Sequence, residues 1–206
     1  MLRASFPSLK FEVINTATTA IDSHVMLPIA KDLAQHQPDL FVIYAGNNEV
    51  IGPYGPGTVF TRAALSLPSI RARIFLNSTR TAQLLAKLSS GRQKPPGWRG
   101  MEMFLGNQVR ADSPQLKAAY GNFGANLRDI VAVARKAGAQ VLLSTIATNV
   151  KDFAPFASLH REGIRQEELQ RWDALVQKGE ASEKAGSPAD ALKSYLAAAE
   201  IDSQYA

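Results

Sequence analysis

Residues 40–49 read Leu40-Phe41-Val42-Ile43-Tyr44-Ala45-Gly46-Asn47-Asn48-Glu49. The first six residues form an apolar run of the length of a buried strand, and a glycine, two asparagines and a carboxylate end it. In an open α/β sheet, ligands bind just beyond the carboxyl ends of the strands. Polar side chains at the end of this run are therefore candidates for a functional site. The alternative is a strand followed by an Asn-rich turn without a function, because Asn tolerates left-handed backbone.

The segments before this run complete a βαβ pattern. Residues 11–15 predict a short strand that ends in a polar turn, and residues 22–33 predict a helix that Asp22 or Ser23 caps. We expect Val25, Ile29 and Leu33, which follow one another at i, i+4 spacing, to form the apolar side of this helix. Strand, helix and strand within so short a stretch indicate a parallel sheet with a right-handed crossover.

Residues 52–112 are expected to form a mainly helical insertion into this sheet domain. Its first part, residues 52–57, is rich in glycine and proline and predicts a turn. The glycine spacing there differs from the dinucleotide-binding fingerprint, which makes a nucleotide-binding function a distant third hypothesis. Residues 61–89 predict helix with a break near Pro68, and residues 90–99 predict a loop.

A long helix is expected after the insertion. Ser113 and Pro114 are a cap followed by a first-turn proline, and Gly138 supplies the stop. One apolar stripe recurs at steps of four and three, formed by Leu116, Tyr120, Phe123, Leu127, Ile130 and Ala134. Residues 141–146 then predict another buried strand.

Residues 165–206 change in character and predict an all-α helical hairpin. Their small residues and one tyrosine fall at the spacing of a single tetratricopeptide repeat, namely Gly179, Gly186, Ala191, Tyr195 and Ala198. Ser182 stands where an aromatic residue is usual, and Ser203 where a proline is usual. A plain helical hairpin without a repeat relationship is the alternative.

Composition narrows the classes of function. The chain has 206 residues, of which 46% are hydrophobic, and a formal charge of +5 carried by scattered basic residues. A nucleic-acid groove normally shows a denser basic patch, so we expect no nucleic-acid partner. No run approaches the roughly 18 apolar residues of a membrane helix. Without cysteine, and with three scattered histidines, we expect no metal site and no cofactor.

The stretch from Val13 to Ser23, the following helix and the strand into Gly46-Asn47-Asn48-Glu49 resemble the SGNH (GDSL-type) hydrolases. The resemblance is specific over residues 11–50 and continues to about residue 150 by element order. It implies a flavodoxin-like, three-layer parallel sheet over residues 1–160, incomplete here. The subgroup with tetratricopeptide repeats is the most similar, and it implies hydrolysis of ester bonds by a serine mechanism.

The family has four signature blocks, and this chain matches two of them. The Gly-Asp-Ser block with the nucleophile has no match before residue 11, and the Asp-x-x-His block has none after residue 150. The second block implies a main-chain N–H donor at Ala20, in place of the usual glycine. The third implies an oxyanion donor in the side chain of Asn48, beside Gly46. We therefore expect this chain to be inactive alone.

Ester cleavage passes through a tetrahedral oxyanion, which prepositioned N–H donors stabilise. A histidine would take the serine proton and an aspartate would orient that histidine. His24 adjoins Ser23, but neighbours in a first helical turn seldom face each other, so we do not expect a catalytic pair there. His36 is expected at the surface. Side chains that could line the pocket are Asn15, Asn47, Glu49 and His160.

Two functions from different classes follow. In the first, the chain is part of an SGNH-type hydrolase whose partner is a small ester or acylated substrate. In the second, it is a non-catalytic scaffold whose helical tail, residues 165–206, docks a protein partner.

Overall fold

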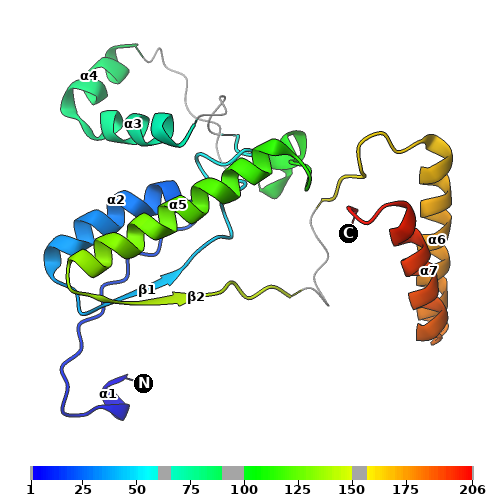
Figure 1. Ribbon diagram of the computed structural model, residues 1–206, viewed down its shortest axis with the longest axis horizontal. Coiled ribbons are helices and arrows are strands. Elements are labelled where there is room, and N and C mark those ends of the chain that lie inside the picture. Colours follow the sequence, from blue (N-terminus) through cyan, green and yellow to red (C-terminus); the bar gives the residue numbers. More distant parts are fainter. Residues whose placement is uncertain (1, 60–65, 90–99, 150–156, 206) are drawn as a thin grey trace.

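The computed structural model describes residues 2–59, 66–89, 100–149 and 157–205 (Figure 1). These residues form a mixed α/β structure: a two-stranded parallel sheet with helices packed on it, followed by a C-terminal helical hairpin. The expected loop at 90–99 and the expected helical residues 61–65 lie outside the described residues. Among the helices that the structure describes, none has the length and apolar character needed to cross a membrane.

The sheet consists of β1 (Leu40–Tyr44) and β2 (Gln140–Ser144). The strands run parallel, with Leu40 beside Gln140 and Tyr44 beside Ser144, so that their carboxyl ends meet at one edge. This confirms the strand expected at 40–45. The strand expected at 141–146 is present and begins one residue earlier.

The strand predicted for residues 11–15 is wrong. In the structure these residues lie outside any helix or strand, between α1 (Leu2–Ser5) and α2 (Ser23–Leu33). Val13 is 76% exposed and Ile14 60% exposed. An extended segment becomes a strand only when its backbone groups pair with a neighbour, and no described strand lies alongside this segment.

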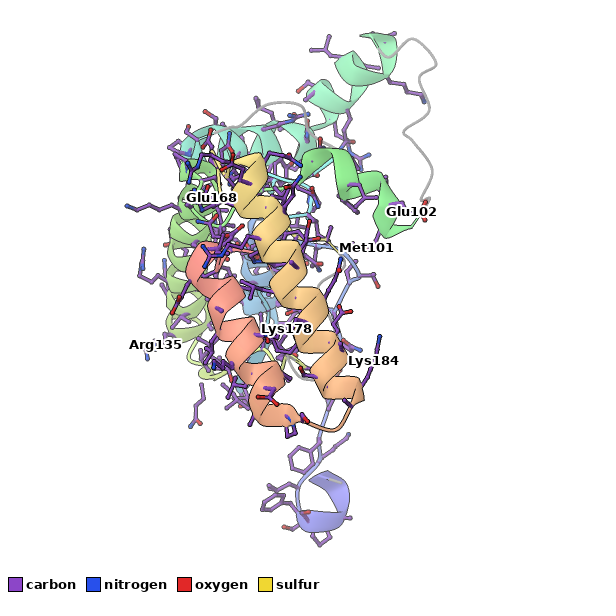
Figure 2. The ribbon with its side chains drawn as sticks, turned by 90° about the vertical axis from the view of Figure 1, so that its right-hand side faces the viewer. Met101, Glu102, Arg135, Glu168, Lys178 and Lys184 are labelled. Carbon is purple, nitrogen blue, oxygen red and sulfur yellow. The ribbon has the colours of Figure 1, made fainter. Side chains whose placement is uncertain are left out.

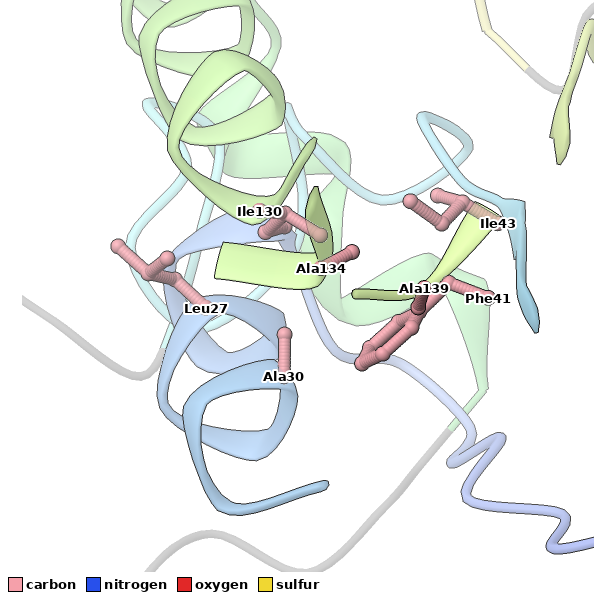
Figure 3. Close-up of a cluster of buried hydrophobic side chains, with 7 residues drawn as sticks. All are labelled: Leu27, Ala30, Phe41, Ile43, Ile130, Ala134 and Ala139. Atoms are coloured by element: carbon pink, nitrogen blue, oxygen red, sulfur yellow. The ribbon is translucent and has the colours of Figure 1, made fainter. Parts of the chain in front are cut away.

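The core lies between the sheet and two helices, α2 and α5 (Pro114–Lys136), which cover the same face. Figure 3 shows its seven buried side chains, Leu27, Ala30, Phe41, Ile43, Ile130, Ala134 and Ala139. The buried side of α2 runs through Leu27 and Ala30, whereas the expected Val25, Ile29 and Leu33 are only half-buried. The i, i+4 spacing predicted the helix correctly, but the predicted buried side is rotated by about half a turn from the observed one.

Helix α5 begins and ends where its capping residues predict. The Ser113 hydroxyl oxygen accepts a hydrogen bond from Leu116 N at 3.2 Å, and Gly138 takes a left-handed backbone with φ of +83°. The predicted stripe needs one correction, because Tyr120 is exposed. The buried side of α5 instead contains Ala119, Asn126, Ile130 and Ala134.

The sheet is buried on one face only. Phe41 and Ile43 point into the core, but Val42 is 65% exposed and its neighbour Leu142 is 55% exposed. Strand β2 has no fully buried residue, so the expectation of a buried strand there is wrong. In the described ranges two layers are present, and no helix covers the second face of the sheet.

The insertion contains α3 (Leu67–Ser78), α4 (Arg80–Ser89) and the 3-10 helix η2 (Met101–Asn107). A shorter 3-10 helix, η1 (Ala34–His36), extends α2. Pro68 does not break a helix: it occupies the first turn of α3, where its missing N–H costs nothing. The break falls at Thr79, between α3 and α4.

The tail forms the expected helical hairpin, α6 (Gln166–Lys184) and α7 (Pro188–Ile201). Figure 2 shows the two helices side by side, joined beyond Lys184. Gly179 is buried against the ring of Tyr195, so that an added Cβ would lie 2.4 Å from Tyr195 Cε1. The small residue therefore lets the helices approach, with Tyr195 filling the space between them.

Candidate functional site

A buried polar cluster lies where the start of α2, the turn after β1 and the middle of α5 meet. Its members are Ser23, His24, Glu49 and Asn126, which are 0%, 6%, 5% and 0% exposed. Four polar side chains at this depth need mutual hydrogen bonds, because an unpaired buried polar group costs about 1–3 kcal/mol. The bonds they form define the geometry of the site.

Glu49 joins the turn after β1 to the first residue of α2. Ser23 N donates to Glu49 Oε1 and Ser23 Oγ donates to Glu49 Oε2, each at 2.8 Å. A carboxylate at the N-terminus of a helix is stabilised by the free N–H groups there. Burial raises the pKa of the Glu49 carboxyl above its usual value, and the two hydrogen bonds from Ser23 lower it in part.

Asn126 links three partners, and their chemistry fixes its orientation. Arg71 can only donate, and its Nη2 lies 2.9 Å from Asn126 Oδ1. Asn126 Nδ2 therefore supplies the donors: it lies 3.0 Å from Ser23 Oγ and 3.1 Å from His24 Nδ1. Arg71 is held in turn by Asp129, at 2.6 Å.

This arrangement determines the tautomer of His24. Because Nδ1 accepts the hydrogen bond from Asn126, the ring proton of the neutral imidazole must lie on Nε2. Burial lowers the pKa of His24; the Asp22 carboxylate opposes this shift and the Arg71 guanidinium adds to it. The ring is therefore kept neutral in the folded protein around neutral pH.

Asp22 connects the start of α2 to the loop after β1. Its Oδ1 accepts from Val25 N at 3.3 Å, which caps the helix, and its Oδ2 accepts from Tyr54 N at 2.7 Å. Of the two residues expected to cap α2, Asp22 is therefore the one that forms the cap. Ser23 and His24 do not bond to each other; both bind the Asn126 amide, as expected for neighbours in a first helical turn.

The predicted oxyanion donors, Ala20 and Asn48, lie on the segment before α2 and on the turn after β1. The hydrogen bonds between Ser23 and Glu49 join these two segments. Asn48 directly precedes Glu49, and Asn48 O accepts from Gly52 N at 2.6 Å. Ala20 lies three residues before Ser23, with φ of +63°, an uncommon conformation for a residue with a Cβ. Gly46 takes φ of +132°. The side chain of Asn48 is half-buried, and no described residue forms a hydrogen bond with its amide.

Other predicted pocket residues lie farther from this cluster. Asn47 is exposed, and Asn15 is exposed with its Oδ1 accepting from Ala17 N at 3.0 Å. His160 contacts the end of the hairpin. Its Nδ1 lies 2.9 Å from Asp202 Oδ2, and its ring stacks on Tyr205 at 4.2 Å between centroids.

The His160–Asp202 pair has the orientation in which an aspartate holds a general base, although Asp-x-x-His is absent from the sequence. The ring is also edge-on to Trp172, at 4.9 Å. These aromatic contacts support a packing role, in which His160 anchors the hairpin to the segment before it.

Two of the cavities that the described residues form lie near the insertion. The larger, about 830 Å³, is lined by His24 and Glu49 and by residues of the loop after β1, α3 and α5. The smaller, about 370 Å³, includes Leu159 but not His160. Neither lining includes Ala20, Gly46 or Asn48. In the described ranges, no three His, Asp or Glu side chains gather as a metal site would require.

Sequence reasoning missed Asn126 and Arg71. Asn126 carried a detectable signal: it occupies a buried position of α5, four residues before Ile130, where the pattern calls for an apolar residue. A polar residue at such a position indicates a buried partner. Arg71 gave no comparable signal, because its contact with Asn126 spans 55 residues.

Comparison with known proteins gives no relative: no family model matches the chain, and neither a curated protein nor a solved structure does.

Proposed function

We propose that this chain is part of an SGNH (GDSL-type) hydrolase that cleaves ester bonds, built on a flavodoxin-like sheet of which two strands are described. In this proposal Ala20 N–H and Asn48 Nδ2, beside Gly46, donate to the oxyanion of the tetrahedral intermediate. The serine and histidine of the reaction belong to the family blocks that this sequence lacks, so the chain alone is inactive.

The observation that carries the proposal is the pair of hydrogen bonds from Ser23 to Glu49. They hold the turn with Asn48 against the segment with Ala20, although the two are far apart in sequence. The parallel pairing of β1 and β2 adds support, because it sets that turn at the edge of the sheet where ligands bind. The left-handed backbone at Ala20 also fits, since backbone strain concentrates at functional sites.

The chemistry requires donors that are rigid before the substrate arrives. An oxyanion donor is worth about 2.7–4 kcal/mol of barrier because it needs no reorganisation during the reaction. Glu49 and the Gly52 N–H to Asn48 O bond both restrain the turn with Asn48. These groups act as positioning groups, while Asn48 itself contacts the reacting oxygen.

The test uses p-nitrophenyl acetate and two protein lengths. The 206-residue chain is expected to show no turnover above buffer. A longer product of the same gene that carries a Gly-Asp-Ser serine is expected to hydrolyse the ester, and Asn48→Ala should lower its kcat about 10²- to 10³-fold. Asn47→Ala, one residue earlier and exposed, is the matched control. Equal activity of the two variants would contradict the proposal.

A second function is favoured by a different observation. Leu192 and Leu196 are one turn apart on α7 and are both more than half exposed. We propose, as the alternative, a tetratricopeptide-like scaffold in which this surface docks a protein. A coding sequence without a Gly-Asp-Ser block upstream and an Asp-x-x-His block downstream would favour the scaffold over the enzyme.

A further inference from the structure

The larger cavity has the size and walls of a small-molecule site. Its volume of about 830 Å³ lies within the range of ligand pockets, roughly 300–1,000 Å³. Separate segments form its wall: the start of α2, the loop that follows β1, α3, the end of η2 and the first half of α5. It is distinct from the proposed oxyanion site, because neither Ala20 nor Asn48 lines it.

His24 presents a hydrogen-bond donor to this cavity. Its Nδ1 is bound to Asn126, which does not line the cavity, and Nε2 carries the proton. No described residue accepts from Nε2. Among the described residues, the polar atoms that are fully enclosed without a partner are Arg71 Nε and Arg110 Nε. His24 Nε2 is not one of them, so solvent still reaches this atom. His24 is only 6% exposed and lines the cavity, so an acceptor in the cavity would satisfy this donor.

The remaining polar groups of the lining are neutral, apart from one carboxylate. Among the described residues no Lys or Arg lines the cavity, and Glu49 would repel an anion. Four carboxamides offer both donors and acceptors, namely Asn107, Gln108, Gln115 and Asn122. Apolar surface from Val59, Ile70 and Val109 lies among them. This mixture suits a molecule that has many hydroxyl groups, no negative charge and apolar C–H faces.

We propose that this cavity binds a hydroxyl-rich molecule of sugar size without negative charge, with His24 Nε2–H donating to one ligand oxygen and Glu49 accepting from a ligand hydroxyl. Each Glu49 oxygen accepts one bond from Ser23 and keeps capacity for a second. The proposal does not depend on ester hydrolysis.

The experiment is an NMR titration of the 206-residue chain, following the imidazole nitrogens and the side-chain amides. The chain has three histidines, so His24→Gln assigns the His24 signals directly. The neutral probes are glucose, galactose, mannose and N-acetylglucosamine; glucuronate is the anionic probe. We expect saturable shifts of His24 Nε2 and of the Asn122 amide with at least one neutral probe, and binding at least about tenfold weaker for glucuronate.

Two tryptophan variants separate the cavity from the rest of the surface. Ala118 is exposed on α5 and lines the cavity, so Ala118→Trp should abolish the shifts without altering the core. Ala132, exposed on the same helix and outside the cavity, gives the control Ala132→Trp, which should bind as the unmodified chain does. The proposal is overturned if no neutral probe binds, if glucuronate binds as tightly, or if binding survives in Ala118→Trp.

Discussion

The side-chain nitrogen of Asn126 lies 3.0 Å from the hydroxyl oxygen of Ser23, across 103 residues of sequence. The contact joins the middle of α5 to the first residue of α2, both fully buried. Because Ser23 also binds Glu49, this one bond connects the packing of the two helices to the turn that follows β1. The candidate site is therefore held by a long-range network rather than by a local motif.

Loss of Asn126 should destabilise the whole domain. Asn126→Ala leaves Arg71 Nη2 without its amide partner and His24 Nδ1 without a donor, and it opens a small cavity. We expect the free energy of unfolding to fall by about 2–4 kcal/mol, measured by urea denaturation. Asn122→Ala, one turn earlier on the same helix and only half-buried, should cost less than about 0.5 kcal/mol. Equal losses in the two variants would show that the network is not what stabilises this region.

Protonation of His24 should make stability depend on pH. Its pKa is lowered below 6.5 in the folded state, so the unfolded chain binds the proton more readily. Stability is then fully present above about pH 6.5 and falls as the pH drops toward the folded pKa, by up to about 1.4 kcal/mol per pH unit. His24→Gln should lose this part of the slope in denaturation curves between pH 5 and 8. The exposed His36→Gln should keep it; a slope that disappears with His36 instead would refute the assignment.

Two glycines on helices should respond to alanine in opposite directions. At Gly179 the new Cβ would meet the Tyr195 ring at 2.4 Å, so Gly179→Ala should lower stability by about 1–3 kcal/mol through overpacking. At Gly121 on α5 a Cβ meets nothing within 4 Å, and Gly121→Ala should raise stability by about 0.5–1 kcal/mol through helix propensity. Thermal unfolding measures both. A stabilising Gly179→Ala would mean that α6 and α7 do not pack as described.

The open face of the sheet should promote association of the chain in solution. Four apolar side chains lie on that face, each more than half exposed: Leu40, Val42, Tyr44 and Leu142. Contiguous apolar surface of this kind favours association. Sedimentation should show concentration-dependent association that Val42→Lys reduces. Phe75→Lys on α3, at a side chain that is 68% exposed, is the control and should have little effect. A chain that stays monomeric at all concentrations would contradict this.

Local chemistry made much of the fold predictable. Asp22 and Ser113 mark the starts of α2 and α5, Gly138 marks the end of α5, and Gly179 with Tyr195 predicts the hairpin. Each of these signals acts within a few residues or within one supersecondary unit, which is why it can be read from sequence.

The predictions that were wrong concern residues whose structure depends on partners far away in the sequence. Residues 11–15 have the composition of a strand but no described strand to pair with. Residues 141–143 are apolar, but in the described ranges no second layer covers them. The bond from Asn126 to Ser23 depends on how α2 and α5 cross, which no local pattern encodes. Of the buried polar cluster, the sequence pattern singled out Glu49 as a pocket residue but not Asn126.

The central claim is that Asn48 Nδ2 and Ala20 N–H converge on one oxyanion position, and an NMR titration of the 206-residue chain with acetate tests it most directly. We predict that the Ala20 amide and the Asn48 side-chain amide shift with a single dissociation constant. Asn48→Ala should abolish the shift at Ala20, and Asn47→Ala should preserve it. Shifts with unrelated dissociation constants, an Ala20 shift that survives in Asn48→Ala, or no shift at either group would contradict the claim.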